Sequence, residues 1–416
     1  MNMSENTPVK IKVEDLSLIF GAQKKRAQKL LDEGVSKTEI LAKTGCTIGV
    51  NKANFEIFEG EIFVIMGLSG SGKSTLLRCL NRLHTPTAGK VLINGHDITK
   101  ETNKELLETR RTELGMVFQK FGLLPHRSVL ENAAFGLEIR GEGEQQRLAQ
   151  AAEALETVGL KGYGDKLPSE LSGGMQQRVG LARALANNPE VLLMDEAFSA
   201  LDPLIKSDMQ DELLEIQSKL KKTIVFITHD LDEAIKIGDR IVIMKDGVIE
   251  QLGTAEEILT NPASEYVEAF VEKIDRKSVI TAGTMMFEKV TKVNVKHHGP
   301  EGVIRRMRTA GMEVLPVVDE NKSFLGFVWL QDAIESSKAK KSSIQDIIKT
   351  EVPSVYAEYT VEEMLPLMVG TKSPLAVVDP NTNKLLGVVY QTSLIIEATK
   401  YDRAEIKEMK EQANDQ

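Results

Sequence analysis

The amino-acid sequence predicts an α/β fold followed by a smaller α+β domain. A short apolar run at residues 61–66 leads into a glycine-rich loop and then a helical pattern, the order typical of a strand, a phosphate-binding loop and a helix. Three further apolar runs, at residues 115–119, 190–196 and 222–229, each end in a polar side chain and favour buried strands. After Asp275, two similar segments lie about 60 residues apart and indicate a tandem repeat.

The size and charge of the chain limit its class. Its 416 residues suggest two or three domains, and its formal net charge of −9 argues against nucleic acid or anionic lipid as the main partner. Cys46 and Cys79 have no metal-like spacing, so we expect two buried thiols in a reducing compartment. The N-terminal residues lack an apolar signal core, and no run approaches the roughly 18 apolar residues of a membrane span. Any role at a membrane is therefore expected to come through a partner.

The loop at residues 67–75 fits the pattern of Gly, four residues, then Gly-Lys-Ser that binds nucleotide phosphates. Glycine is needed because the backbone must turn tightly for its N–H groups, with the positive end of the next helix, to face phosphate oxygens. We expect Lys73 to reach the β- and γ-phosphates and the Ser74 hydroxyl to bind Mg²⁺. The residues assigned to phosphate binding in this loop are Gly67, Ser69, Gly70, Gly72, Lys73, Ser74 and Thr75.

The other apolar runs deliver polar side chains to their carboxyl ends. Asp195 and Glu196 are adjacent, and in an alternating strand they would point to opposite sides. That arrangement would let Asp195 hold Mg²⁺ while Glu196 polarises a water for attack on the γ-phosphate. Gln119 ends one run, where its amide could reach a metal-bound water, and His229 ends another. A lone Gln or His is usually structural, so the combination carries the functional interpretation.

A helical region follows the first strand. Residues 9–20 alternate as a half-buried strand that Phe20 closes, and residues 22–48 then predict two short helices, the second opened by a Ser36–Glu39 capping box. One interpretation is a helix-turn-helix that reads DNA. The position between two strands and the acidity of the chain favour instead an insertion packed on the nucleotide-binding domain.

A second helical region covers about residues 130–185 and is expected to form a helical subdomain. Within it, Ser172 stands at a helix start and is followed by two glycines. Such a terminus suits a phosphate, although many are ordinary helix caps.

In their order and spacing these motifs resemble the ATP-binding-cassette (ABC) ATPase family. The resemblance implies hydrolysis of ATP with Mg²⁺ at sites shared between two subunits, so that a chain with one cassette acts as a homodimer. The motifs that carry it are the phosphate loop, Gln119, residues 171–178, Asp195 with Glu196, residues 199–202 and His229.

The resemblance also implies roles for single residues. Glu196 would be the general base, and His229 would contact the γ-phosphate and order the attacking water. Gln119 would couple the metal site to a membrane subunit, and Ser74, Gln119 and Asp195 would hold the metal. Phe20 is the candidate for the aromatic ring that stacks on adenine.

Three residues are implied to act across the dimer. Ser172 and Gly174 would contact the γ-phosphate of ATP bound to the second copy, and Asp202 would communicate across the interface. Many family members have Pro after the catalytic Glu, where this chain has Ala197. We expect that difference to leave the chemistry unchanged.

The repeat after Asp275 is similar to a tandem pair of cystathionine-β-synthase-type (CBS) modules, which often bind adenine nucleotides. Where such pockets usually carry Thr or Ser and Asp, the first repeat has Trp329 and Asp332 and the second has Tyr390 and Ser393. Sensing of an adenine or cyclic dinucleotide, sensing of ionic strength, and dimer scaffolding are all open for this domain.

A cassette with a helical insertion after its first strand, the sequence of residues 194–205 and the C-terminal CBS pair together resemble the ATP-binding subunit of glycine betaine importers, over nearly the whole chain. The resemblance implies a permease subunit and a solute-binding protein or domain as partners, a peripheral position on the cytoplasmic face of the cell membrane, and no nucleic acid. Choline, carnitine or another small solute is the alternative cargo, and a soluble ABC ATPase outside transport is a more distant alternative. The predicted domains are residues 1–275 for the ATPase, 276–400 for the CBS-type regulatory domain and 401–416 for a polar tail.

Overall fold

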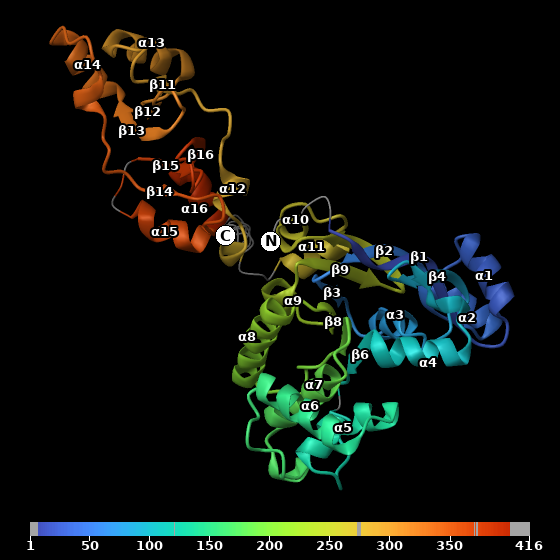
Figure 1. The fold of residues 1–416 in the computed structure, drawn as a ribbon. Coiled ribbons are helices and arrows are strands. Elements are labelled where there is room, and N and C mark those ends of the chain that lie inside the picture. The colour runs from blue at the N-terminus through green and yellow to red at the C-terminus, as the bar shows by residue number, and fades with distance from the viewer. Residues whose placement is uncertain (1–6, 120, 273–275, 370, 372, 400–416) are drawn as a thin grey trace, which may run out of the picture. The chain divides into compact units, whose positions relative to one another are not determined.

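The computed structural model describes residues 7–119, 121–272, 276–369, 371 and 373–399. The chain divides into two compact units, Met1–Val271 and Glu272–Gln416, and each is described by itself (Figure 1). The predicted polar tail at residues 401–416 lies outside the described residues.

A six-stranded sheet in the order β10-β9-β3-β8-β7-β6 is the base of the first unit. All of its neighbouring pairs are parallel except β9 with β10, which pair as an antiparallel hairpin. Its strands are β3 (Ile62–Met66), β6 (Leu114–Val117), β7 (Val191–Asp195), β8 (Thr223–Thr228), β9 (Arg240–Lys245) and β10 (Val248–Gly253). Every residue of β3, β7 and β8 is buried, as expected for parallel strands covered on both faces.

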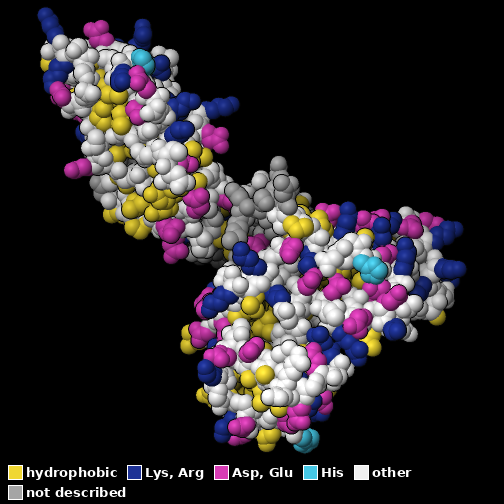
Figure 2. Space-filling model, in the orientation of Figure 1, with side chains coloured by type: hydrophobic (Ala, Val, Ile, Leu, Met, Phe, Trp, Pro, Cys, Tyr) yellow, Lys and Arg dark blue, Asp and Glu magenta, His cyan; other side chains and the backbone are white. Residues whose placement is uncertain are grey.

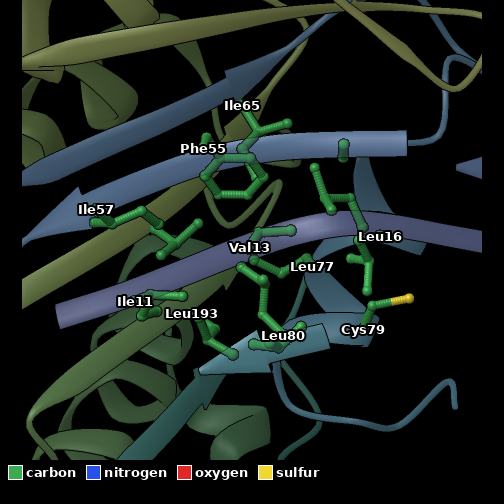
Figure 3. Close-up of a cluster of buried hydrophobic side chains, with 14 of the residues drawn as sticks. Ile11, Val13, Leu16, Phe55, Ile57, Ile65, Leu77, Cys79, Leu80 and Leu193 are labelled. Carbon is green, nitrogen blue, oxygen red and sulfur yellow. The ribbon is translucent and has the colours of Figure 1, made fainter. Parts of the chain in front are cut away.

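A four-stranded antiparallel sheet, β2-β1-β4-β5, completes the strands of this unit. It consists of β1 (Val9–Phe20), β2 (Thr47–Phe58), β4 (Ala88–Ile93) and β5 (His96–Asp97). The main core lies between the two sheets and α3 (Lys73–Leu80), where β1, β2 and β3 contribute Ile11, Phe55 and Ile65 (Figure 3). Cys79 of α3 belongs to this core, and both cysteines are buried, as predicted.

The predicted insertion forms α1 (Lys24–Asp32) and α2 (Lys37–Thr44) between β1 and β2. Ser36 caps α2 by accepting a hydrogen bond from the Glu39 N–H, which confirms the predicted helix start. Ala27 and Ile40 are fully buried and pack against Ile19, Cys46 and Ile48 of the neighbouring strand segments. The two helices are thus fixed on the edge of the sheet where β1 and β2 meet.

The remaining helices of the first unit surround the sheets. Helices α5, α6 and α7 gather beside the six-stranded sheet, in the region predicted as a helical subdomain (Figure 1). The helices are α4 (Asn103–Thr112), α5 (Val129–Arg140), α6 (Glu144–Thr157), α7 (Gly173–Ala186), α8 (Pro203–Leu220), α9 (Leu231–Ile237), α10 (Ala255–Thr260) and α11 (Glu265–Val271), with the short 3-10 helices η1 (Ile98–Lys100) and η2 (Pro168–Glu170). On the face seen in Figure 2, acidic and basic side chains of this unit are interspersed.

Three predicted element ends are wrong. The helix after the glycine-rich loop is predicted from Thr75 to Leu83 but begins at Lys73 and ends at Leu80. Gln119 lies beyond β6, which ends at Val117. Glu196 lies beyond β7 and has a positive φ of 47°, so strand alternation is not what separates its side chain from that of Asp195.

The second unit holds two similar three-stranded sheets, β11-β12-β13 and β14-β15-β16. In each, the first pair is parallel and the second antiparallel, so the predicted repeat is also a repeat of topology. Phe327 and Val388, one from each sheet, belong to a shared core. The elements are η3 (Arg276–Ser278), α12 (Ala282–Met285), β11 (Val293–Asn294), α13 (Pro300–Ala310), β12 (Val314–Val318), β13 (Phe324–Trp329), α14 (Leu330–Lys338), η4 (Gln345–Ile347), β14 (Ser354–Val355), α15 (Val361–Met368), β15 (Leu375–Val378), β16 (Leu385–Val389) and α16 (Gln391–Thr399).

Candidate functional site

The glycine-rich loop joins β3 to α3 in a backbone conformation that only glycine adopts easily. Gly67, Gly70 and Gly72 have φ values of 146°, 81° and 106°. A Cβ atom at Gly67 would lie 2.2 Å from the Met244 carbonyl oxygen, and one at Gly72 would lie 2.3 Å from that of Gly49. Close approach of β2 and β9 therefore adds a packing reason for two of these glycines.

Lys73 opens α3 and is buried, with 5% of its surface exposed. Its ammonium donates hydrogen bonds to the carbonyl oxygens of Gly67, at 2.8 Å, and Leu68, at 3.2 Å. Burial lowers its pKa, and the nearby carboxylates of Glu196 and Asp195 oppose that effect. The Lys73 ammonium is therefore held on the loop itself, among acceptors that an anionic phosphate can replace.

The Ser74 hydroxyl lies one residue further along the same helix. It donates a hydrogen bond of 2.8 Å to Oδ1 of Asp195 at the end of β7. Arg78, one turn on, places a guanidinium nitrogen 3.5 Å from the other carboxylate oxygen. One hydroxyl and one carboxylate fit Mg²⁺, which usually takes few protein ligands and completes its shell with waters and phosphate oxygens. In the described part of the chain, no cluster of three or more His, Cys, Asp or Glu side chains forms a separate metal cage.

The Glu196 carboxylate is the point at which four motifs meet. Gln119 Nε2 donates to Glu196 Oε2 at 3.1 Å. His229 Nδ1 lies 3.8 Å from Glu196 Oε1, and Lys73 Nζ lies 3.9 Å from the same oxygen. Gln119 also donates to the Ser199 hydroxyl at 3.2 Å, which fixes the amide between the two loops. The positive φ of Glu196 turns the chain away from β7, and the loop then brings Ser199 back to the Glu196 carbonyl at 2.9 Å.

His229 follows β8, which pairs in parallel with β7, so the carboxyl ends of the two strands lie at one edge of the sheet. The next turn is held by charged side chains: Lys206 of α8 pairs with Asp230 at 2.6 Å, and the Thr228 hydroxyl donates to the buried Glu233. These contacts fix the start of α9 and with it the position of His229.

A cavity of about 250 Å³ lies against the loop. Its lining combines the phosphate-loop residues and Glu196 with a second group at and near the β1–β2 junction. The lining residues are Phe20, Lys37, Thr47, Ile48, Gly49, Ser69, Gly70, Gly72, Lys73, Ser74, Thr75 and Glu196. The Phe20 ring is 38% exposed and meets the His84 ring edge-on at 5.4 Å. The ring predicted to stack on adenine thus lines the same cavity as the phosphate loop.

Three predicted residues, Ser172, Gly174 and Asp202, do not line this cavity. Ser172 caps α7 by accepting from the Met175 N–H at 3.3 Å, and Asp202 is the N-cap residue of α8. A Cβ atom on Gly174 would lie 2.6 Å from the Ile205 side chain, so the starts of α7 and α8 pack closely. The three residues form a second cluster, apart from the phosphate loop of the same chain.

One groove adjoins the site, and a larger cavity lies apart from it. A groove of about 480 Å³ extends from Gln119 along an apolar wall that includes Phe121, Leu123, Pro125 and Pro168. A larger cavity of about 590 Å³ lies between α4 and the helices α5 to α8 and contains none of the predicted site residues.

Lys37 also lines the cavity, although it was not among the predicted site residues. Nothing in the linear pattern distinguishes it from the other lysines of the insertion. Its place in the cavity depends on how α2 packs on the β1–β2 junction.

The structure describes no helix that is both long and apolar enough to cross a membrane.

Two family models match the chain: one described as ABC transporter over residues 50–199, and one described as CBS domain over residues 344–399. The glycine betaine/carnitine transport ATP-binding protein GbuA of Listeria monocytogenes is 52% identical over 93% of this chain and 96% of its own length. The glycine betaine transport ATP-binding protein OpuAA of Bacillus subtilis is 51% identical over 94% of this chain and 93% of its own.

A solved structure is similar to part of the chain. It is a dimeric ATP-binding cassette in a post-hydrolysis state with bound ADP and phosphate, 32% identical, with a TM-score of 0.50. The match covers 59% of this chain and 98% of that structure. The likeness therefore concerns one cassette and leaves the rest of the chain outside it.

Proposed function

The chain belongs to the family of ATP-binding subunits of ABC transporters, and from this premise we propose that it hydrolyses ATP to drive the import of glycine betaine through membrane-embedded partners. The observation that carries the ATPase proposal is the meeting of Lys73, Gln119 and His229 at the Glu196 carboxylate, beside the phosphate loop. The cargo proposal rests on the relatives that are named for glycine betaine transport.

In the proposed mechanism Lys73 and the loop N–H groups bind the β- and γ-phosphates of ATP. Ser74 and Asp195, with Gln119, would hold Mg²⁺, which supplies charge neutralisation at the β- and γ-phosphate oxygens when bound. The Lys73 ammonium would exchange its hydrogen bonds to the carbonyl oxygens of Gly67 and Leu68 for hydrogen bonds to phosphate oxygens. Its side chain would stay beside the loop.

Glu196 would act as the general base. It takes a proton from a water whose oxygen bonds to the γ-phosphorus, while the bond from that phosphorus to the β–γ bridging oxygen breaks and releases ADP and phosphate. Gln119 and His229, both within 4 Å of the carboxylate, would orient the water and the γ-phosphate. The groove from Gln119 along Phe121 and Leu123 is the proposed contact for a permease segment.

A dimer would complete each site. Ser172, Gly174 and Asp202 lie apart from their own phosphate loop, so we propose that they face the ATP held by a second copy. That the similar solved cassette is a dimer supports this arrangement. The partners proposed in addition are a permease and a solute-binding protein or domain, with this chain peripheral to the cytoplasmic face of the membrane.

The proposed domain limits are residues 1–275 for the ATPase and 276–400 for a regulatory CBS pair. The match of the CBS model to residues 344–399 and the repeated sheet topology support the second domain. Its proposed ligand is an adenine or cyclic dinucleotide.

Uptake of labelled glycine betaine at high osmolarity tests the whole proposal. Cells without other betaine carriers receive the natural chain or Glu196→Gln, with Asp165→Asn in an exposed loop as a matched control for loss of one charge. We expect uptake with the natural chain and the control but none with Glu196→Gln. Uptake undiminished by Glu196→Gln would contradict the ATPase role. Uptake of labelled choline or carnitine, but not of labelled glycine betaine, by cells with the natural chain would move the cargo to those solutes.

A further inference from the structure

The insertion places one lysine in the nucleotide cavity. Phe20 pairs with Thr47 and Ile19 with Ile48 at the junction of β1 and β2, so α1 and α2 leave and return to the sheet at the ring proposed to stack on adenine. Lys37, the first residue of α2, lines the cavity together with Phe20, Thr47 and the phosphate loop.

Lys37 lies at the end of the cavity away from the phosphate loop. A second cavity, of about 470 Å³, shares Lys37, Thr47 and Ile48 with the nucleotide cavity but contains no residue of the loop. These three residues therefore separate the two cavities. Because the loop takes the β- and γ-phosphates, Lys37 is placed to face the nucleoside side of the same ligand.

The Lys37 ammonium has no partner within the described part of the chain, whereas Lys43 pairs with Glu39 and Lys52 with Asp32. The side chain is half-buried, and the helix that carries it is fixed by the buried Ala27 and Ile40. An unpaired ammonium held at one end of a cavity favours a ligand that brings acceptor oxygens to it.

We propose that Lys37 binds the adenosine and α-phosphate part of the nucleotide, and so makes the insertion part of the ATP site. This inference rests on the proposed function of the phosphate loop. The part of the ligand that Lys37 contacts is common to ATP and ADP, so the contact affects the binding of both alike.

The test is the affinity of the full chain for ATP and ADP, measured by titration calorimetry. Lys37→Ala is expected to raise both dissociation constants by the same factor, roughly threefold to tenfold, as for a partly exposed charge-assisted hydrogen bond. Lys37→Arg should restore most of the affinity, and the dependence of ATP binding on salt should be weaker in Lys37→Ala than in the natural chain. A purely structural role for Lys37 would leave the salt dependence of ATP binding unchanged.

Two controls separate the possible failures. Lys25→Ala removes the same charge from an exposed position on the same insertion and should leave both constants unchanged. Lys73→Ala should weaken ATP binding through the phosphate loop. If Lys73→Ala weakens binding and Lys37→Ala does not, the inference is overturned and the ATP site stands. A loss for ATP alone in Lys37→Ala would place Lys37 at the γ-phosphate and also overturn it, and unchanged affinity in Lys73→Ala would remove the ATP site itself.

Discussion

The Ser74 hydroxyl lies 2.8 Å from Oδ1 of Asp195, although 121 residues separate the two along the chain. Ser74 belongs to the helix that follows the phosphate loop, and Asp195 ends the buried strand β7. Two motifs that each predict Mg²⁺ binding from local sequence are thus brought into contact by the fold. The contact supports Mg²⁺ binding at this place more strongly than either motif alone.

Asp195→Asn should weaken the dependence of ATP binding on Mg²⁺. The Asn oxygen can still accept from Ser74, but the negative charge that favours the cation is lost. Hydrolysis should fall by roughly 100-fold or more, because the loss is felt where charge develops in the transition state. Titration of ATP with and without Mg²⁺ measures the first effect. An unchanged Mg²⁺ requirement, next to a normal Asp165→Asn control, would show that the cation is held elsewhere.

Glu196→Gln should bind ATP but hydrolyse it roughly 10²- to 10⁴-fold more slowly, the range for loss of a general base. Gln is similar in size, so the contact with Gln119 can be kept while the ability to take a proton is removed. With ATP and Mg²⁺ the variant should accumulate as a dimer, detected by light scattering. Brisk turnover by this variant would remove Glu196 as the base. Glu59→Gln, at an exposed position outside the site, is the matched control.

Phe20→Ala should weaken binding of ATP, since stacking of a base on an aromatic ring is worth roughly 1–3 kcal/mol. Phe20→Tyr should keep most of the affinity because the ring is retained. Inorganic triphosphate has no base, so its affinity should be the same for the natural chain and Phe20→Ala. An equal loss for both ligands would mean that the ring only supports the loop, through its contact near Gly49. Leu41→Ala, an exposed apolar residue of the insertion, controls for nonspecific effects.

The sequence could predict the α/β class and the order of motifs because each depends on short-range pattern. A strand, a glycine-rich turn and a helix are neighbours in the chain, and β3 and α3 lie as predicted to within a few residues. The polar ends of β7 and β8 meet because parallel strands align their carboxyl ends. The roles of the site residues stay predictions, although the geometry brings most of them together.

Other features depend on packing and have no local signal. The positive φ of Glu196 arises where the chain leaves β7, and alternation in the sequence predicted a continued strand there. The position of Lys37 depends on how Ile40 packs on Ile19 and Ile48. Whether Ser172 and Asp202 reach a nucleotide depends on a second copy, which no pattern within one chain specifies.

Removal of residues 276–416 should leave ATP hydrolysis within about twofold of the full chain, since the first unit has its own core. In the transporter reconstituted in vesicles, the response of hydrolysis to salt and to added nucleotides should be lost. Trp329→Ala is a smaller change in the region of the proposed CBS pocket. It removes the ring whose centre lies 4.5 Å from the Lys349 ammonium, which also lies 3.2 Å from Asp332. A full response in the truncated chain would show that regulation lies outside this unit.

The buried pair of Glu61 and Arg240 predicts how stability of the first unit depends on pH. Glu61 is 1% exposed, accepts a hydrogen bond of 2.7 Å from the Phe58 N–H and lies 3.2 Å from a guanidinium nitrogen of Arg240. Burial is the largest influence and raises the pKa of Glu61 to about 7. The folded state therefore keeps a proton on Glu61 between pH 4.5 and about 7, while the unfolded state releases it.

The contribution of Glu61 to the free energy of unfolding is full below pH 4.5 and falls as pH rises to about 7. It falls because the unfolded state binds fewer protons than the folded state over this range. The decrease is at most about 3 kcal/mol, since each pKa unit corresponds to about 1.4 kcal/mol. Glu61→Gln cannot titrate, so urea unfolding followed by circular dichroism should show a flatter pH profile than the natural chain. Trp329 is the only tryptophan and lies in the second unit, so its fluorescence gives a separate readout that should not change. Gln also changes the hydrogen bonds made to the Phe58 N–H and to Arg240, so the stability of the variant differs at every pH, which is why the slope and not the absolute value is the test. A slope equal to that of the natural chain and of the exposed control Glu59→Gln would mean that Glu61 stays ionised over this range.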